Sequence, residues 1–131
     1  MKLGIIKNED RVVYKALEQV YKALGYEVEI FSQNEFQPRY VSERSLDAIL
    51  VEENRDSDRS AGFAIAVRRN VPERTIVGYF FFNPLSQTRL TELAEHGVRN
   101  FNFLDLDKDK FEKWLRWIGV KITDDIKRRI F

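Results

Sequence analysis

Carboxylate side chains closely follow two of the most apolar runs in this sequence. Glu9 comes shortly after the run 3–6, and Glu52 follows the run 47–51 without a break. Carboxylate and carbonyl oxygens are the ligands that Mg²⁺ and Ca²⁺ prefer in proteins. The groups that could hold such a cation are Glu9, Glu52 and the carbonyl group of Asn54, with Asp10 and Glu53 as further oxygen donors.

Composition excludes most other metal and nucleophile chemistry. The 131 residues contain no cysteine and one histidine, His96, so thiolate zinc sites, iron–sulfur clusters, catalytic cysteines and two-histidine metal sites cannot form. The chain has 22 basic and 21 acidic residues, and this balance gives no overall field that would attract nucleic acid. No run is apolar enough to predict a membrane span or a signal peptide, which indicates a soluble, cytoplasmic protein.

The hydrophobic pattern alternates between strands and helices along the whole chain. Apolar runs predict strands, and apolar residues spaced three or four apart predict amphipathic helices. Gly25 and Gly97 stand where glycines that end helices are found. The strands are expected at 3–6, 26–31, 47–51, 75–82 and 98–104. The helices are expected at 12–24, 62–70, 85–96, 105–118 and 123–131, with weak helix signals in 32–46 and a polar loop at 55–60.

This alternation predicts one α/β domain with a parallel sheet covered by helices on both faces. The working site of such a sheet lies beyond the carboxyl ends of its strands. Those ends are expected at residues 7–10, 52–54, 81–83 and 104–105. The acidic residues Glu9, Asp10, Glu52 and Glu53 therefore belong to the predicted site.

Several segments resemble the receiver domain of bacterial response regulators. They are residues 3–10 followed by Gly25-Tyr26-Glu27-Val28, the run 47–52, and the stretch 94–101. The resemblance covers about residues 2–118. It implies a flavodoxin-like (CheY-like) three-layer sandwich whose five-stranded parallel sheet has the order 2-1-3-4-5. Residues 119–131 would form a C-terminal extension that packs on the domain or projects from it.

The same resemblance implies that the phosphorylation site is degenerate. A receiver uses an aspartate nucleophile, a carboxylate-bound Mg²⁺, a lysine and a serine or threonine to take up a phosphoryl group. The matching positions here carry Glu52 as the nucleophile, Asn8 and Glu9 as the acidic pair, Phe82 for the serine or threonine and Leu104 for the lysine. The longer glutamate side chain misplaces its carboxylate for in-line attack. The sequence therefore looks like a pseudo-receiver.

Three roles for Glu52 stay open at this point. Its carboxylate could mimic an acyl phosphate and hold an active-like conformation, although it carries less charge than a phosphate. It could be an ordinary acidic strand end, solvated or paired with Lys7. It could also belong to a residual Mg²⁺ or Ca²⁺ site formed with Glu9 and Asn54, so weak metal binding is the only cofactor expectation.

Aromatic and basic residues toward the C-terminus predict an interaction face. Residues 108–131 carry a net charge of +4, which leaves −3 for the rest of the chain. In receivers the fourth and fifth helices and the fifth strand form the usual dimer and partner surface, so the resemblance implies a homodimer through that face. The residues that could contribute are Phe101, Trp114, Trp117, Lys127, Arg128 and Arg129.

The most consistent interpretation is a stand-alone pseudo-receiver, not an enzyme, that acts by phosphorylation-independent protein contacts in signalling or transcription regulation. The length leaves no room for an output domain. One alternative is a small nucleotide- or metal-binding flavodoxin-like domain, but the chain lacks phosphate-binding glycine motifs. Another is a nucleic-acid-associated regulator that uses the basic C-terminal segment, but no helix-turn-helix motif follows the receiver-like part.

Overall fold

A computed structural model of the protein describes residues 2–7, 18, 21–22, 25–53, 57–81 and 85–102; Ser57, Phe101 and Asn102 are described by their backbone only. The expected helices at 105–118 and 123–131, and most of the one at 12–24, lie outside these residues. So does the expected C-terminal extension at 119–131. No helix in the described part of the chain is long and apolar enough to cross a bilayer.

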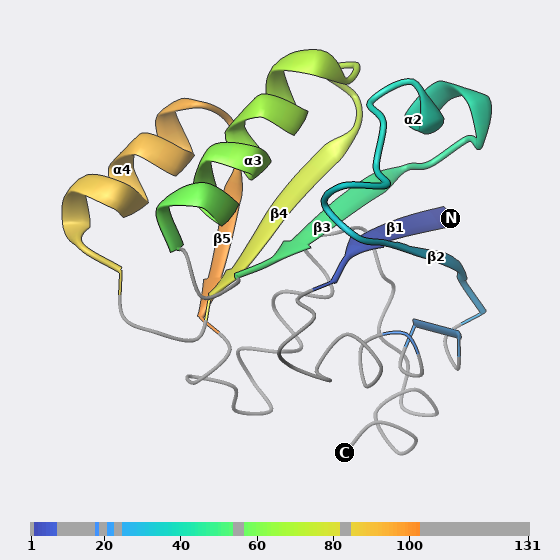
Figure 1. The fold of residues 1–131 in the computed structure, drawn as a ribbon, viewed down its shortest axis with the longest axis horizontal. Helices are drawn as coiled ribbons and strands as arrows, with labels where there is room; N and C mark the ends of the chain where they lie inside the picture. The colour runs from blue at the N-terminus through green and yellow to red at the C-terminus, as the bar shows by residue number, and fades with distance from the viewer. Residues whose placement is uncertain are drawn as a thin grey trace.

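Five parallel strands form one sheet with the order β2-β1-β3-β4-β5 (Figure 1). The strands are β1 (Lys2–Ile6), β2 (Glu27–Phe31), β3 (Ala48–Glu52), β4 (Ile76–Phe81) and β5 (Arg99–Asn102). The three central strands, β1, β3 and β4, are mainly apolar and buried, as expected for inner strands of a parallel sheet, whereas the edge strands β2 and β5 contain charged or polar residues. The predicted flavodoxin-like sheet and its strand order are confirmed.

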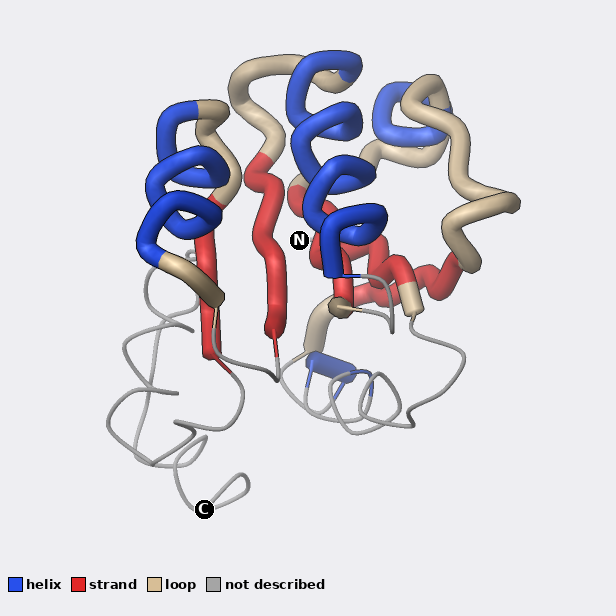
Figure 2. The backbone as a smooth tube through the Cα atoms, turned by 60° about the vertical axis from the view of Figure 1, so that its left-hand side comes forward, coloured by secondary structure: helices blue, strands red, loops and turns tan. Residues whose placement is uncertain are grey.

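Three helices lie together on one face of the sheet (Figures 1 and 2). They are α2 (Tyr40–Glu43), α3 (Ser57–Asn70) and α4 (Gln87–Glu95). Two turn positions expected from the sequence are confirmed: Gly25 and Gly97 have positive φ angles of 86° and 77°. Glycine reaches this region without the steric cost that a Cβ atom imposes.

The start of α3 corrects a sequence-based expectation. Residues 55–60 were expected to form a polar loop, whereas α3 already begins at Ser57. An acidic side chain in the first turn, here Asp58, stabilises the positive end of the helix dipole. Asp58 also pairs with Arg89 of α4. The polar residues that begin α3 were therefore mistaken for a loop, because helix starts and loops favour the same residue types.

The two faces of the sheet carry separate sets of buried side chains, because successive side chains of a strand point to opposite faces. Val51, Tyr79 and Phe81 belong to the cluster packed under α3. Leu50 and Phe80 alternate with them and point to the other face, and both are buried. The neighbouring aromatic residues Phe80 and Phe81 of β4 therefore contribute rings to opposite faces of the sheet.

Candidate functional site at the carboxyl edge of the sheet

The sheet brings the ends of β1, β3 and β4 to one edge, as the alternating pattern predicted. Ile6 of β1 pairs in register with Val51 of β3, and Glu52 pairs with Phe80 of β4. Glu53 then donates its N–H to the Phe80 carbonyl over 2.7 Å, so the pairing continues one residue beyond β3. We call this region the carboxyl edge.

Both glutamates at the carboxyl edge are buried. Glu52 and Glu53 are each only 1% exposed. Because Val51 points toward α3, alternation sends the Glu52 side chain to the opposite face of the sheet. Full burial of a carboxylate is rare in proteins, since it removes the charge from water. The interpretation of Glu52 as a solvated strand end is therefore wrong, while its pairing with Lys7 stays a prediction.

A buried hydroxyl pair lies beside this edge, between α3 and β4. The hydroxyl groups of Ser60 and Tyr79 are 2.7 Å apart. The Tyr79 ring also stacks with Phe81, with centroids 6.4 Å apart and an angle of 24° between the planes. This hydrogen bond ties the first turns of α3 to the strand that precedes the predicted site. The sequence signal for it is a tyrosine within an otherwise apolar strand, whose hydroxyl needs a partner when buried.

Several of the predicted site residues cannot be placed. Asn8, Glu9, Asn54, Phe82 and Leu104 lie outside the described residues, as do Trp114, Trp117, Lys127, Arg128 and Arg129. The backbone of Phe101 pairs in register with Phe80. Within the part that the structure describes, no group of three or more His, Asp or Glu side chains is arranged to hold a metal ion. The proposed metal site, which needs Glu9 and Asn54, thus stays a prediction.

A cation–aromatic cluster, which the sequence did not reveal, joins α2 to the edge strand β2. The Arg44 guanidinium lies 4.2 Å from the Tyr40 ring centroid and 5.3 Å from that of Phe31. It also donates to Glu29 over 2.9 Å. This hydrogen bond lowers the pKa of the Glu29 carboxyl group. The cluster fixes α2 to the sheet, and its charges discourage the edge strand from pairing with another chain.

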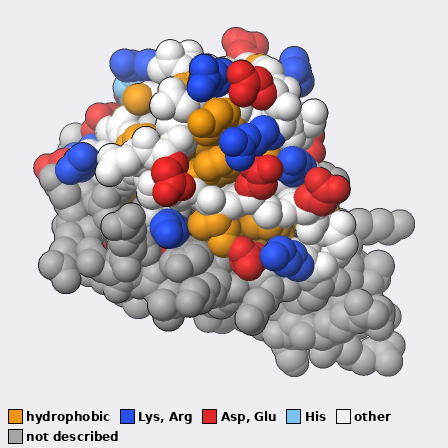
Figure 3. Space-filling model, turned by 45° about the vertical axis from the view of Figure 1, so that its right-hand side comes forward, with side chains coloured by type: hydrophobic (Ala, Val, Ile, Leu, Met, Phe, Trp, Pro, Cys, Tyr) orange, Lys and Arg blue, Asp and Glu red, His pale blue; other side chains and the backbone are white. Residues whose placement is uncertain are grey.

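Charged and apolar groups alternate closely on the side of the molecule that is on the right in Figure 1 and is turned toward the viewer in Figure 3. Figure 3 shows apolar surface between neighbouring basic and acidic side chains, without a broad region of one sign. Such a surface is typical of a solvated face rather than of a nucleic-acid interface, which needs a continuous basic stripe. The described residues on this side therefore do not point to a second site.

The fold and the carboxyl edge together define a CheY-like, flavodoxin-like architecture. No family model and no curated protein matches the chain by sequence. Among solved structures, the Vibrio cholerae chemotaxis protein CheY4 is similar, with 17% identity and a TM-score of 0.65, and the match covers 89% of this chain and 96% of that one.

Two further structures share the architecture. A pilus assembly-related protein from Burkholderia pseudomallei has 14% identity and a TM-score of 0.60, and the match covers 89% of this chain and 87% of that one. A diflavin flavoprotein A3 from Nostoc sp. has 12% identity and a TM-score of 0.52, with 99% and 92% of the two chains covered. At these identities the similarity establishes the fold alone, because one fold hosts many functions.

Proposed function

We propose that this protein is a pseudo-receiver, a receiver-like signalling module that acts through protein contacts and without phosphoryl transfer. The observation that carries the proposal is the burial of Glu52, the last residue of β3, at 1% exposure. This residue occupies the position that matches the phosphoacceptor in the resemblance to receivers. The CheY-like fold supports a response-regulator type of role, and a cytoplasmic location is part of the proposal.

Access is the physical reason for this interpretation. A phosphoryl group must approach its nucleophile in line and within about 3–3.5 Å. A carboxylate that solvent does not reach offers no such path unless the edge opens. Glu52 pairs with Phe80, and Phe81 beside it is buried as well. At the other matching positions, Phe82 and Leu104 are apolar and Asn8 is uncharged, so none of them supplies the cation or the hydroxyl group that receivers use to hold a transferred phosphoryl group.

Phosphotransfer gives the first test. After incubation with acetyl phosphate and Mg²⁺, we expect intact-mass spectrometry to detect no phosphorylated protein. The matched variant Glu52→Asp restores the usual nucleophile while leaving the other positions unchanged. We expect it to stay unmodified too, because the lysine and the serine or threonine are still absent. Phosphorylation of the wild-type protein at Glu52 would contradict the proposal.

Partner contact is proposed to occur through α4, β5 and the segment that follows, with a homodimer as the expected assembly. The described outward residues of α4 are mainly polar, including Gln87, Thr88 and Thr91. A hydrophobic anchor must therefore come from elsewhere on this face, and Trp117 is the proposed one, since tryptophan is enriched among residues that dominate interfaces.

The dimer is checked by light scattering over a range of protein concentrations. We expect a mass that rises toward two chains for the wild type and stays at one chain for Trp117→Ala. The control Tyr26→Ala removes a partly exposed aromatic ring just before β2 and should leave the mass of the dimer unchanged. A wild-type protein that stays monomeric at millimolar concentration would contradict the proposed homodimer.

A further inference from the structure

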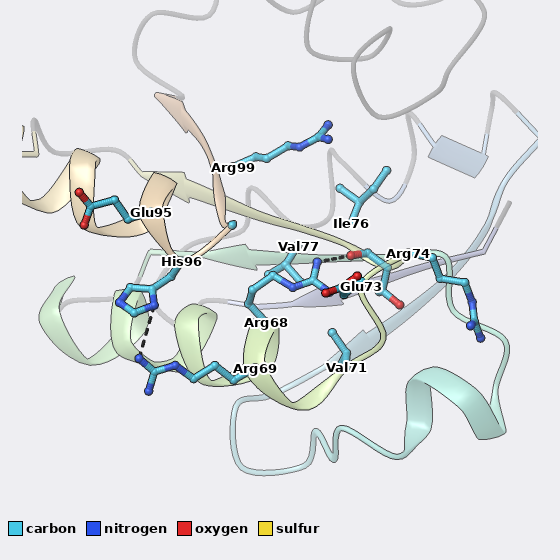
Figure 4. A pocket seen from close by; sticks show the side chains of 12 residues that line it. Arg68, Arg69, Val71, Glu73, Arg74, Ile76, Val77, Glu95, His96 and Arg99 are labelled. Atoms are coloured by element: carbon cyan, nitrogen blue, oxygen red, sulfur yellow. Dashed lines mark hydrogen bonds between the residues drawn. The ribbon is translucent and has the colours of Figure 1, made fainter.

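A groove lined by arginines lies at the opposite edge of the sheet from Glu52. Its volume is about 630 Å³, and its lining includes Arg68, Arg69, Arg74, Arg99, His96 and Ile76 (Figure 4). We call it the arginine groove. It lies where α3 and α4 end and β4 and β5 begin. Since β4 has six residues, the groove and the carboxyl edge are about 17 Å apart.

Arg68 builds one wall of the groove. Its guanidinium donates to the backbone carbonyls of Pro72 and Thr75. The Thr75 N–H donates to the same Pro72 carbonyl over 2.9 Å, which closes the turn. The Arg68 stem passes Gly97, where a Cβ atom would be 3.4 Å from Arg68 Cδ. The turn that presents Arg74 is therefore held in place before any ligand arrives.

The remaining cations are exposed around the rim. Arg69 reaches His96 Nδ1 over 3.4 Å, while Arg74 and Arg99 extend from the turn and from β5 (Figure 4). Basic residues in the last turn of a helix stabilise its negative end, and this accounts for Arg68 and Arg69. Arg74 and Arg99 lie on no helix, so the helix dipole does not account for them.

The charge of the lining favours an acidic ligand. The lining carries four guanidinium groups, including that of Arg68, which is bound to the turn, and two carboxylates, those of Glu73 and Glu95, so its net charge is positive. The guanidinium groups point in different directions instead of converging on one spot (Figure 4). A single small anion would therefore contact few of them, whereas an extended segment with several acidic groups would reach more.

The rest of the lining distinguishes a peptide from a nucleic acid. The described lining residues include no Phe, Tyr or Trp on which a base could stack, and single-stranded nucleic acids depend on such stacking. Ile76, whose side chain is only partly buried, instead provides apolar surface, while Val71 and Val77 beneath it are buried. We propose that the arginine groove binds an extended acidic segment of a partner protein. The groove includes Glu95 of α4 and Arg99 of β5, so it borders the face proposed for the dimer, but its binding of an acidic segment does not depend on that dimer.

The probe is a fluorescently labelled hexaglutamate peptide, followed by anisotropy and by ¹⁵N amide spectra of the full chain. We expect saturable binding, with shifts at residues 69–77 and 95–99. The double variant Arg69→Gln/Arg74→Gln should weaken binding at least about fivefold, as expected for the loss of two exposed ion pairs. The control Lys22→Gln/Arg39→Gln removes two charges from other faces and should change binding by less than about twofold.

Arg69, Arg74, Lys22 and Arg39 are all exposed, so both double variants should fold as the wild type does. The wild-type shift map supports or contradicts the proposal without any variant. The proposal is overturned by an absence of binding, by shifts away from the groove, or by equal loss in both double variants. Tighter binding of a thymidine hexanucleotide than of the peptide would also overturn it and would favour nucleic acid.

Discussion

Replacing Phe80 by alanine is expected to lower the free energy of unfolding by about 3–5 kcal/mol. The ring is 1% exposed and lies on the face of the sheet that also carries Leu3, Ile5 and Leu50, all of them fully buried. Removing it takes apolar surface out of the core and leaves a cavity that the rigid strands cannot collapse to fill. Phe80 also pairs with Glu52, so the effect arises at the carboxyl edge itself.

Urea denaturation followed by tryptophan fluorescence measures this change. The control Phe80→Leu keeps most of the volume and should cost less than about 1.5 kcal/mol. A loss below about 1 kcal/mol for Phe80→Ala would show that the strand ends are loosely packed. The carboxyl edge would then be an open pocket rather than a filled core, contrary to the proposed pseudo-receiver.

The second large effect is expected at the hydroxyl pair of Ser60 and Tyr79. Tyr79→Phe keeps the ring under α3 and removes only the hydroxyl group. Because both hydroxyls are buried and 2.7 Å apart, Ser60 loses that partner in a place that water does not reach. Such a loss costs about 1–3 kcal/mol. The cost should appear as a lower free energy of unfolding with an unchanged fold.

A double-mutant cycle isolates this interaction. We expect Tyr79→Phe and Ser60→Ala to be less than additive, with a coupling of about 1 kcal/mol in urea denaturation. Tyr26→Phe serves as the matched control, because that hydroxyl belongs to a partly exposed residue, and it should cost less than about 0.5 kcal/mol. Full additivity at Ser60 and Tyr79 would mean that the two hydroxyls do not stabilise each other.

The central strands of the sheet were predictable because buried parallel strands produce nearly continuous apolar runs, which the sequence shows directly. The run 47–51, for example, became β3 with a shift of one residue at each end. The beginning of α3 was not predictable in the same way. Ser57 and Asp58 favour helix starts and loops alike, since their side chains bond to backbone in both. The burial of Ser60 and Ala61 against the sheet favours a helix over a loop in this segment.

The position of the candidate site at the strand ends could be predicted from the sequence, but the burial of Glu52 could not. The sequence indicated that Glu52 stands at a strand end beside other strand ends, and the sheet confirms this for the described strands. Its burial could not be predicted, because charged residues are almost never fully buried and the sequence carries no sign of an exception. The Ser60–Tyr79 bond joins residues 19 positions apart and follows from tertiary packing.

The arginine groove shows the limit of composition most clearly. A net charge of +1 gave no reason to expect a basic surface among residues 68–99. The arginines come from three segments, the end of α3, the turn before β4 and the start of β5. They become neighbours only because β4 and β5 are adjacent and parallel and α3 ends beside them. Net charge counted along the sequence therefore could not reveal this basic surface, because the fold brings its arginines together.

The most direct test of a phosphorylation-independent module uses beryllium fluoride, which imitates a bound phosphoryl group. It would be added with Mg²⁺ to ¹⁵N-labelled protein, with an aspartate-bearing receiver domain as the positive control. We expect the amide signals of Lys7, Glu52 and Glu53 to stay in place while those of the control domain shift. Saturable shifts at these three residues would show a working acceptor site and would contradict the account.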